Sequence, residues 1–176
     1  MSMKINTKKL TLTALFAVIA LVIFVIEAQI PLPFFAPGLK LGLANIVILF
    51  VLFLGENWKA RDVFLIFLVR VILAAFITGH PMSLIFSFTG GLFALLVMLA
   101  MKRFIKEPPI PVVSVGGAVF HNMGQILAAA VVMRSASVFA YLPVLVAGGI
   151  ISGLLTGFAV LVLFKTHPKF IGFIRR

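Results

Sequence analysis

The chain has 176 residues, of which 63% are hydrophobic and 11% are charged, and its formal net charge is +11. A soluble domain of this size lacks the interior to bury so much apolar surface, so the composition excludes a soluble protein and predicts an integral membrane protein. The absence of cysteine excludes disulfides, thiolate catalysis and Cys-ligated metals.

Apolar runs between polar breaks predict an all-α bundle of six transmembrane helices in one membrane domain, 1–176. The expected spans are 10–27, 41–54, 62–78, 83–101, 112–133 and 141–164. Several of them have the roughly 17–25 residues that cross a bilayer. Because apolar segments recur along the whole chain, we expect the first one to stay in the protein rather than to be cleaved as a signal peptide.

Basic residues in the connections predict the orientation of this bundle. Lysine and arginine gather at both tails and at the second and fourth connections, whereas only Lys40 and Arg134 fall at the odd-numbered ones. The positive-inside rule therefore predicts a multi-pass protein of the cell membrane with both termini in the cytoplasm. Since topology explains the charge, we expect contact with lipid headgroups rather than nucleic-acid binding.

The first span carries a stripe of small residues that is predicted to be a partner interface. The stripe consists of Thr13, Ala14, Ala17 and Ala20. Small residues let another helix approach closely, and that helix can belong to a partner protein or to the protein's own bundle.

A proline-rich connection follows, from Glu27 to Asn45. Pro31, Pro33 and Pro37 prevent a continuous helix there, yet the segment stays apolar. Two interpretations stay open: an outer lid that folds over the bundle, or a loop that rests on the headgroups.

Arg70 lies near the middle of the third span. An arginine at that depth costs about 2.5–3.5 kcal/mol on insertion scales, so it should face the bundle interior. Among the four acids of the chain only Glu27 lies near the outer half of the membrane. Arg70 is therefore predicted either to be held in a network with Glu27 or backbone carbonyls, or to anchor an anionic ligand.

Polar residues recur in the fourth and fifth spans. Ser87 can bond back to its own helix turn or lie beside a ligand. His121 and Gln125 are four residues apart and share a helix face, and Asn122 lies about 100° around the helix from His121. The three polar residues can tie helices together or line a cavity, and we favour the cavity because interhelical hydrogen bonds contribute little net stability. No metal site is expected near these residues, because no further acidic side chain lies at the spacing that metal ligands need.

Glycines at positions 149, 153 and 157 of the sixth span stand four residues apart on one face. This spacing predicts a surface for close helix packing.

Four segments together resemble the Gx transporter family, whose members often carry the label heptaprenyl diphosphate synthase component I. They are GLKLGLAN (38–45), the segment around Arg70, SLIFSFTGG (83–91) and GAVFHNMGQ (117–125). The family is grouped with the substrate-binding S components of energy-coupling-factor (ECF) vitamin transporters. The resemblance implies six helices and a cavity at the outer side, and uptake that requires a transmembrane coupling protein and two cytoplasmic ATPases. It also implies a docking role for small residues of the first helix.

The chain is not expected to be an enzyme. Prenyl chain elongation needs clustered aspartates for Mg²⁺, but Asp62 is the single aspartate, and there is no nucleotide-binding P-loop. The prediction is thus a binding subunit of an importer for a vitamin-like or isoprenoid/quinone-precursor molecule, without a cofactor. Its predicted ligand residues are Arg70, Ser87, His121, Asn122 and Gln125, with Asn45 and Lys40 at the entrance. Two alternatives stay open: a non-catalytic membrane subunit of isoprenoid synthesis, or a stand-alone facilitator.

Overall fold

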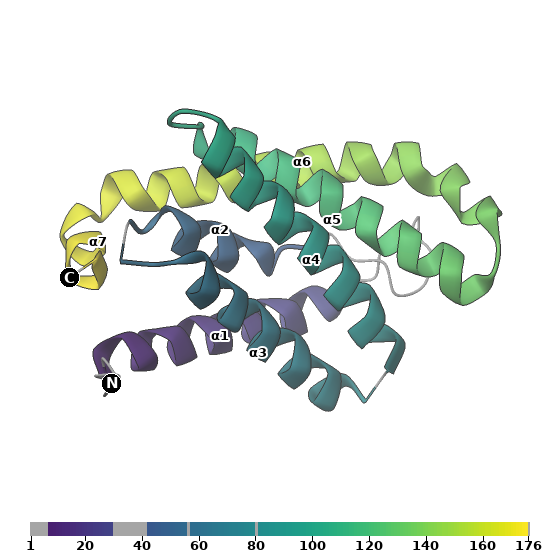
Figure 1. Cartoon of the computed structure of the whole chain (residues 1–176), viewed down its shortest axis with the longest axis horizontal. Helices are drawn as coiled ribbons and strands as arrows, with labels where there is room; N and C mark the ends of the chain where they lie inside the picture. Colours follow the sequence, from purple (N-terminus) through teal and green to yellow (C-terminus); the bar gives the residue numbers. More distant parts are fainter. Residues whose placement is uncertain (1–6, 30–41, 56, 80, 176) are drawn as a thin grey trace.

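The computed structural model describes residues 7–29, 42–55, 57–79 and 81–175, and these form helices without any strand (Figure 1). The helices are α1 (Thr7–Ala28), α2 (Asn45–Phe53), α3 (Ala60–Thr78), α4 (Pro81–Phe104), α5 (Ile110–Met133), a 3₁₀ helix η1 (Ala136–Tyr141), α6 (Leu142–Thr166) and α7 (Pro168–Arg175). The predicted all-α class is confirmed. Residues 30–41 of the proline-rich connection, which include the three prolines of the possible lid and Lys40, lie outside the described residues.

Within the described ranges, four helical segments are long and apolar enough to cross a membrane. They are Thr7–Ala28, Met82–Phe104, Ile110–Met133 and Ala136–Thr166. The third predicted span forms a helix of 19 residues, α3, but it includes Arg61, Asp62 and Arg70, which lower its hydrophobicity. A membrane protein is supported, whereas the count of six crossings and the cytoplasmic termini stay predictions.

The second predicted span, 41–54, is corrected by the structure. Its helix, α2, has only nine residues, which corresponds to about 13 Å and is less than half of a hydrocarbon core of ~30 Å. Six of the nine residues, Val47–Leu52, are buried, and α2 packs against α1, α3, α4, α5 and α6. A short helix that is apolar on all sides belongs in an interior. α2 is therefore a central half-helix around which the longer helices are arranged (Figure 1).

The predicted packing face on α6 is confirmed by its contacts with α5. A Cβ atom added at Gly149 would lie 3.1 Å from the Cα of Val119, and one at Gly153 would lie 2.6 Å from the Cα of Val115. At Gly157 the corresponding distance to the Cα of Pro111 is 2.6 Å. The glycines thus let the two backbones approach too closely for any side chain to lie between them.

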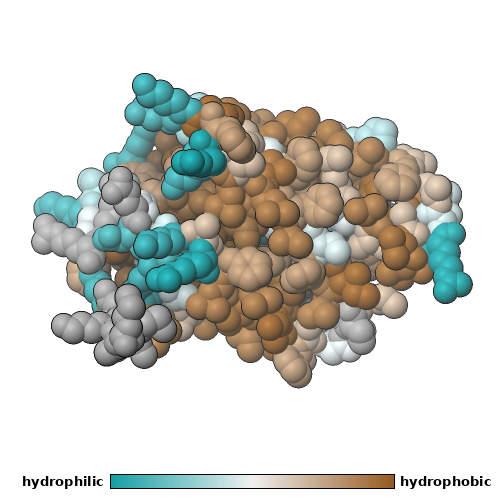
Figure 2. Space-filling view, in the orientation of Figure 1, coloured by the Kyte–Doolittle hydropathy of each residue, from teal (hydrophilic) through white to brown (hydrophobic). Residues whose placement is uncertain are grey.

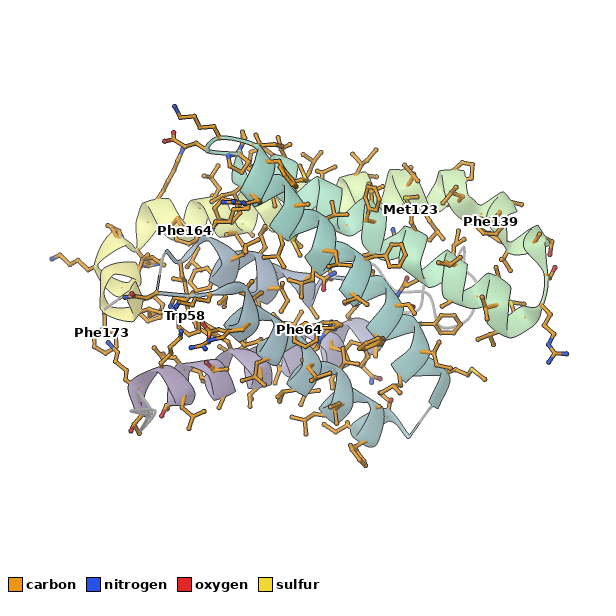
Figure 3. The ribbon with its side chains drawn as sticks, viewed as in Figure 1. Trp58, Phe64, Met123, Phe139, Phe164 and Phe173 are labelled. Atoms are coloured by element: carbon orange, nitrogen blue, oxygen red, sulfur yellow. The ribbon has the colours of Figure 1, made fainter. Side chains whose placement is uncertain are left out.

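The start of α1 and the C-terminal helix α7 lie at the same end of the bundle. Lys8 Nζ of α1 donates to the carbonyl oxygen of Phe173 in α7 at 2.8 Å, and Lys9 pairs with Asp62 of α3 at 2.5 Å. Trp58 and Phe173 are labelled at this end in Figure 3. Figure 2 shows hydrophilic side chains gathered here and hydrophobic ones over the middle of the visible face. We call this end the basic end.

The predicted partner interface on α1 is largely buried in the protein's own core. Ala17 and Ala20 are 2% and 0% exposed, and Thr13 is also buried, whereas Ala14 is exposed. Ala17 and Ala20 pack in the main cluster together with residues of α2, α3 and α4. Of the two interpretations of the stripe, the burial supports packing within the bundle for Thr13, Ala17 and Ala20, and of the four residues only Ala14 is exposed.

Candidate functional site

Four helices bring polar side chains to a small cavity in the interior of the bundle. The cavity is lined by Phe24 and Glu27 of α1, Gly42 before α2, Arg70 of α3, Ser87 of α4, and His121 and Gln125 of α5. Its volume of about 10 Å³ is close to the space that one water molecule needs. The cavity is thus a small site with several polar side chains in its wall.

The site lies well inside the apolar part of the bundle. Arg70 is ten residues from the start of α3, and Asn45 is eight residues from the end of α2 near the basic end. At a rise of 1.5 Å per residue the site is about 12–15 Å from that end, close to half of a hydrocarbon core. Lipid supplies no hydrogen-bonding partners at this depth, so the polar groups must find them in the protein or in a ligand.

Two aromatic rings lie beside Arg70, but two of its N–H donors have no hydrogen-bond partner among the described residues. Its side chain is 2% exposed, and its guanidinium carbon lies 5.7 Å from the ring centroid of Phe24 and 5.9 Å from that of Phe67. Cation–π attraction to these rings offsets part of the cost of burial. Within the described residues, however, neither Nε nor Nη2 has a hydrogen-bond partner. These two nitrogens form one edge of the guanidinium group, which is the edge that binds a carboxylate with two parallel bonds.

Glu27 brings a negative charge to the same cavity. Its Oε1 accepts a hydrogen bond of 2.6 Å from the backbone N–H of Gly42, which holds the turn before α2 against the end of α1. The attraction between Glu27 and Arg70 also acts across the cavity. The Glu27 network predicted for Arg70 is therefore partly present.

His121 is held at the start of α2 by a side-chain hydrogen bond. The amide nitrogen of Asn45 lies 3.1 Å from Nδ1 of His121, and an amide nitrogen can only donate, so Nδ1 is the acceptor in this contact. The ring also packs against Gly90 of α4. His121 thus joins α2, α4 and α5 at one point.

Two glycines make room for this imidazole. A Cβ atom at Gly42 would lie 2.8 Å from His121 Cδ2, and one at Gly90 would lie 3.0 Å from His121 Cε1 and 2.8 Å from Gln125 Cγ. Gly42 also has a φ of 78°, which side chains rarely adopt. The sequence patterns LGLAN and SFTGG therefore contain the glycines between which His121 lies.

Asn122 does not line the cavity. It is 1% exposed, and its amide donates to the carbonyl oxygen of Leu145 in α6 at 2.7 Å. The cause is the 100° rotation between consecutive helix residues, which directs His121 and Gln125 to the cavity but Asn122 toward α6. Asn122 is not among the residues that line this cavity, and its bond to Leu145 is the helix-tying contact that the sequence left open as the alternative.

Asn122→Ala is expected to lower stability without weakening ligand binding. The substitution removes the hydrogen bond to Leu145, and interhelical bonds in membranes contribute about 0.6 kcal/mol on average. Thermal unfolding in detergent should show a lower midpoint for Asn122→Ala and a smaller change for Gln125→Ala, whereas ligand titration should show the opposite order. Equal ligand affinity losses in both variants would contradict the separation of the two residues.

The structure thus brings together most of the residues predicted from the sequence. Arg70, Ser87, His121 and Gln125 line the cavity and Asn45 bonds to His121, while Asn122 points away and Lys40 lies outside the described part. Sequence reasoning missed Phe24 and Phe67, because aromatic residues in an apolar helix give no signal of a cation nearby. Among the described residues no three His, Asp or Glu side chains are grouped as for a metal.

The comparison with protein families gives one match. The family described as heptaprenyl diphosphate synthase component I matches residues 16–163, which is well over half of the chain. No curated protein and no solved structure matches the chain significantly.

Proposed function

The chain belongs to the heptaprenyl diphosphate synthase component I family, and from this premise we propose that it is a membrane-embedded binding subunit for a small anionic molecule. The ligand is captured in the polar cavity from the outer side of the cell membrane. The protein holds and orients this molecule and catalyses no reaction itself.

The observation that carries this proposal is the open edge of Arg70. Among the described residues two donors of this side chain have no partner, and the side chain is 2% exposed. Leaving them unpaired costs free energy, because lipid offers no acceptor. A carboxylate or phosphate meets both donors at once and forms charge-assisted bonds. The cavity of about 10 Å³ has no room for such a group, so binding requires the surrounding helices to move.

Glu27 narrows the ligand class further. An anionic group that approaches Arg70 also approaches the Glu27 carboxylate, since both residues line the cavity. The repulsion is avoided when the ligand carries a hydrogen-bond donor beside its anionic group. Ser87 and Gln125 add further polar groups to the lining of the cavity. We therefore propose a vitamin-like or quinone-precursor acid that combines a carboxylate or phosphate with a neighbouring donor and a small apolar body.

Transport by this subunit would require partners. The chain has no P-loop, so the energy for uptake would come from two cytoplasmic ATPases joined to the chain by a transmembrane coupling protein, as in ECF transporters. The exposed side of α1 around Ala14 is the part of the predicted stripe that stays available for this contact. In this proposal both termini lie in the cytoplasm, in line with the lysines and arginines at the basic end.

Native mass spectrometry of the protein purified from its own membranes tests the proposal. We expect a molecule of a few hundred daltons bound one to one and absent from Arg70→Gln. Proteoliposomes that contain only this chain should take up none of it, whereas uptake by the chain alone would make it a stand-alone facilitator. A stable wild-type protein that never retains a small molecule and binds no carboxylate would contradict the proposal.

The family's description favours a second candidate function. In this alternative the chain is a non-catalytic membrane subunit that works with a prenyl diphosphate synthase. Its single aspartate leaves catalysis to the partner, because prenyl transfer uses several carboxylates to hold Mg²⁺. Co-purification with a prenyltransferase, rather than with ATPases, would support this candidate.

A further inference from the structure

Two buried groups of opposite charge face the polar cavity. Among the described residues Glu27 is the one buried carboxyl group and Arg70 is the one buried guanidinium group, at 3% and 2% exposed, and both line the cavity. Their charges attract each other across it. Because a carboxylate and a guanidinium together carry no net charge, the empty cavity can lie at this depth of the membrane without a counterion.

A bound anion removes this neutrality. When a ligand carboxylate pairs with the open edge of Arg70, two negative charges face one positive charge. Lipid supplies no water at this depth, and charges repel strongly in an apolar interior. A hydrogen-bond donor on the ligand eases one contact with Glu27 but leaves the net charge unchanged. Two carboxyl groups that are confined to one site share a proton for this reason, so binding should take up one proton from water.

The groups that face Glu27 indicate where this proton goes. Within the described part of the chain, α3 and α5 contribute one charged or titratable side chain each to the cavity wall, and α2 and α4 contribute none: these side chains are Arg70 and His121. Arg70 always keeps its proton. Nδ1 of His121 accepts from the amide of Asn45, so a proton on this nitrogen would break that bond. The proton is therefore expected on Glu27.

Glu27 can take up a proton and still hold the turn before α2. Its Oε1 accepts the backbone N–H of Gly42 at 2.6 Å, and the carbonyl oxygen of a neutral carboxyl group accepts such a bond as a carboxylate oxygen does. With the proton on Oε2, Glu27 becomes a hydrogen-bond donor. The ligand carboxylate would then accept hydrogen bonds from both Arg70 and Glu27.

We propose that the cavity binds a monocarboxylate together with one proton, and that Glu27 takes up this proton. The ligand, Arg70 and the protonated Glu27 then carry no net charge, like the empty cavity. A phosphate monoester, whose charge at pH 7 is about −1.5 to −2, would leave negative charge uncompensated. The inference rests on the proposed function and narrows its ligand class from a carboxylate or phosphate to a singly charged carboxylic acid.

Titration calorimetry with benzoate counts the proton. The protein is titrated in nanodiscs of phosphatidylcholine, once in Tris and once in HEPES, because these buffers release different heats when they ionise. The difference between the two observed heats should correspond to uptake of about one proton for each benzoate bound. Since a proton is taken up, the affinity for benzoate should fall about tenfold for each unit of pH above neutral.

Two further probes locate the proton and test the ligand class. A proton taken up with benzoate can lie on the ligand or on the protein, whereas a sulfonate stays ionised. Benzenesulfonate should therefore also bind with uptake of about one proton, which places the proton on the protein. Phenyl phosphate should bind at least tenfold more weakly than benzoate at about pH 8, where it is a dianion.

Glu27→Gln should bind benzoate without proton uptake and with an affinity that does not change with pH. At about pH 8 it should bind at least tenfold more tightly than the wild-type protein, because no proton has to be taken up. Glutamine keeps an oxygen for the N–H of Gly42 and adds an N–H donor for the ligand. Glu107→Gln changes an exposed acid and is the matched control, which should behave like the wild-type protein. His121→Gln should still take up about one proton.

The possible failures can be told apart. If benzoate and benzenesulfonate bind without proton uptake, or if phenyl phosphate binds as tightly as benzoate, this inference is refuted and the anion site of the proposed function stands. Loss of proton uptake in His121→Gln but not in Glu27→Gln would refute the role of Glu27. If neither acid binds to the folded wild-type protein, the proposed function fails and this inference fails with it. Should Glu27→Gln not fold, the wild-type titrations and His121→Gln still decide the question.

Discussion

Arg70→Lys is expected to weaken binding of the small anionic ligand at least a hundredfold, although the positive charge is kept. Lysine cannot present the Nε and Nη2 edge that lies open in the cavity, so the paired contact with two ligand oxygens is lost. Each charge-assisted hydrogen bond contributes about 1.5–3 kcal/mol, and 1.4 kcal/mol corresponds to a tenfold change in affinity. Titration calorimetry with the molecule identified by native mass spectrometry, and with benzoate as a simple carboxylate probe, measures this loss.

Arg61→Gln is the matched control for this experiment. Arg61 lies on the same helix, and its side chain is 77% exposed, so the variant should bind the ligand normally. Arg70→Met tests the competing interpretation, in which Arg70 only locks the fold through Glu27. If Arg70→Met and Arg70→Lys unfold at markedly lower temperature while the affinity for the carboxylate is unchanged, Arg70 is a structural residue and the proposed function loses its main support.

Gly153→Leu is expected to prevent formation of the folded bundle. A Cβ atom at this position would lie 2.6 Å from Val115 Cα, 3.0 Å from its backbone nitrogen and 3.1 Å from the carbonyl oxygen of Ser114. All three neighbours are backbone atoms, which cannot rotate away, so α6 would have to leave α5. Even Gly153→Ala should cost about 1–3 kcal/mol, as overpacking does. Size-exclusion chromatography in detergent and thermal unfolding report the effect.

Gly172→Ala provides the comparison for Gly153. No atom lies within 4 Å of a Cβ added at Gly172 in α7, and alanine favours a helix over glycine by about 1 kcal/mol. This variant should therefore fold as well as the wild-type protein or better. A normally folded Gly153→Leu would show that α5 and α6 are not in the close contact described above.

The sequence alone was sufficient to predict the membrane helices and the residue types that need partners. Hydropathy is a local property, so long apolar runs indicate α1, α4, α5 and α6 within a few residues of their observed ends. Arg70, Ser87, His121 and Gln125 could be grouped without a structure because lipid cannot satisfy polar side chains, so they must converge in the interior. The shared face of His121 and Gln125 follows from helix geometry alone.

Only the tertiary structure decided which helix face meets which neighbour. In a membrane both the core and the lipid-facing surface are apolar, so the sequence carries no signal that separates them. For this reason Ala17 and Ala20 looked equally suited to a partner and to the bundle, and the apolar run at 41–54 did not reveal that α2 is a half-helix. The placement of helices that are distant in sequence decides the remaining features. It directs Asn122 toward α6, sets the open edge of Arg70 between two phenylalanine rings, and leaves an apolar groove between α1 and α6.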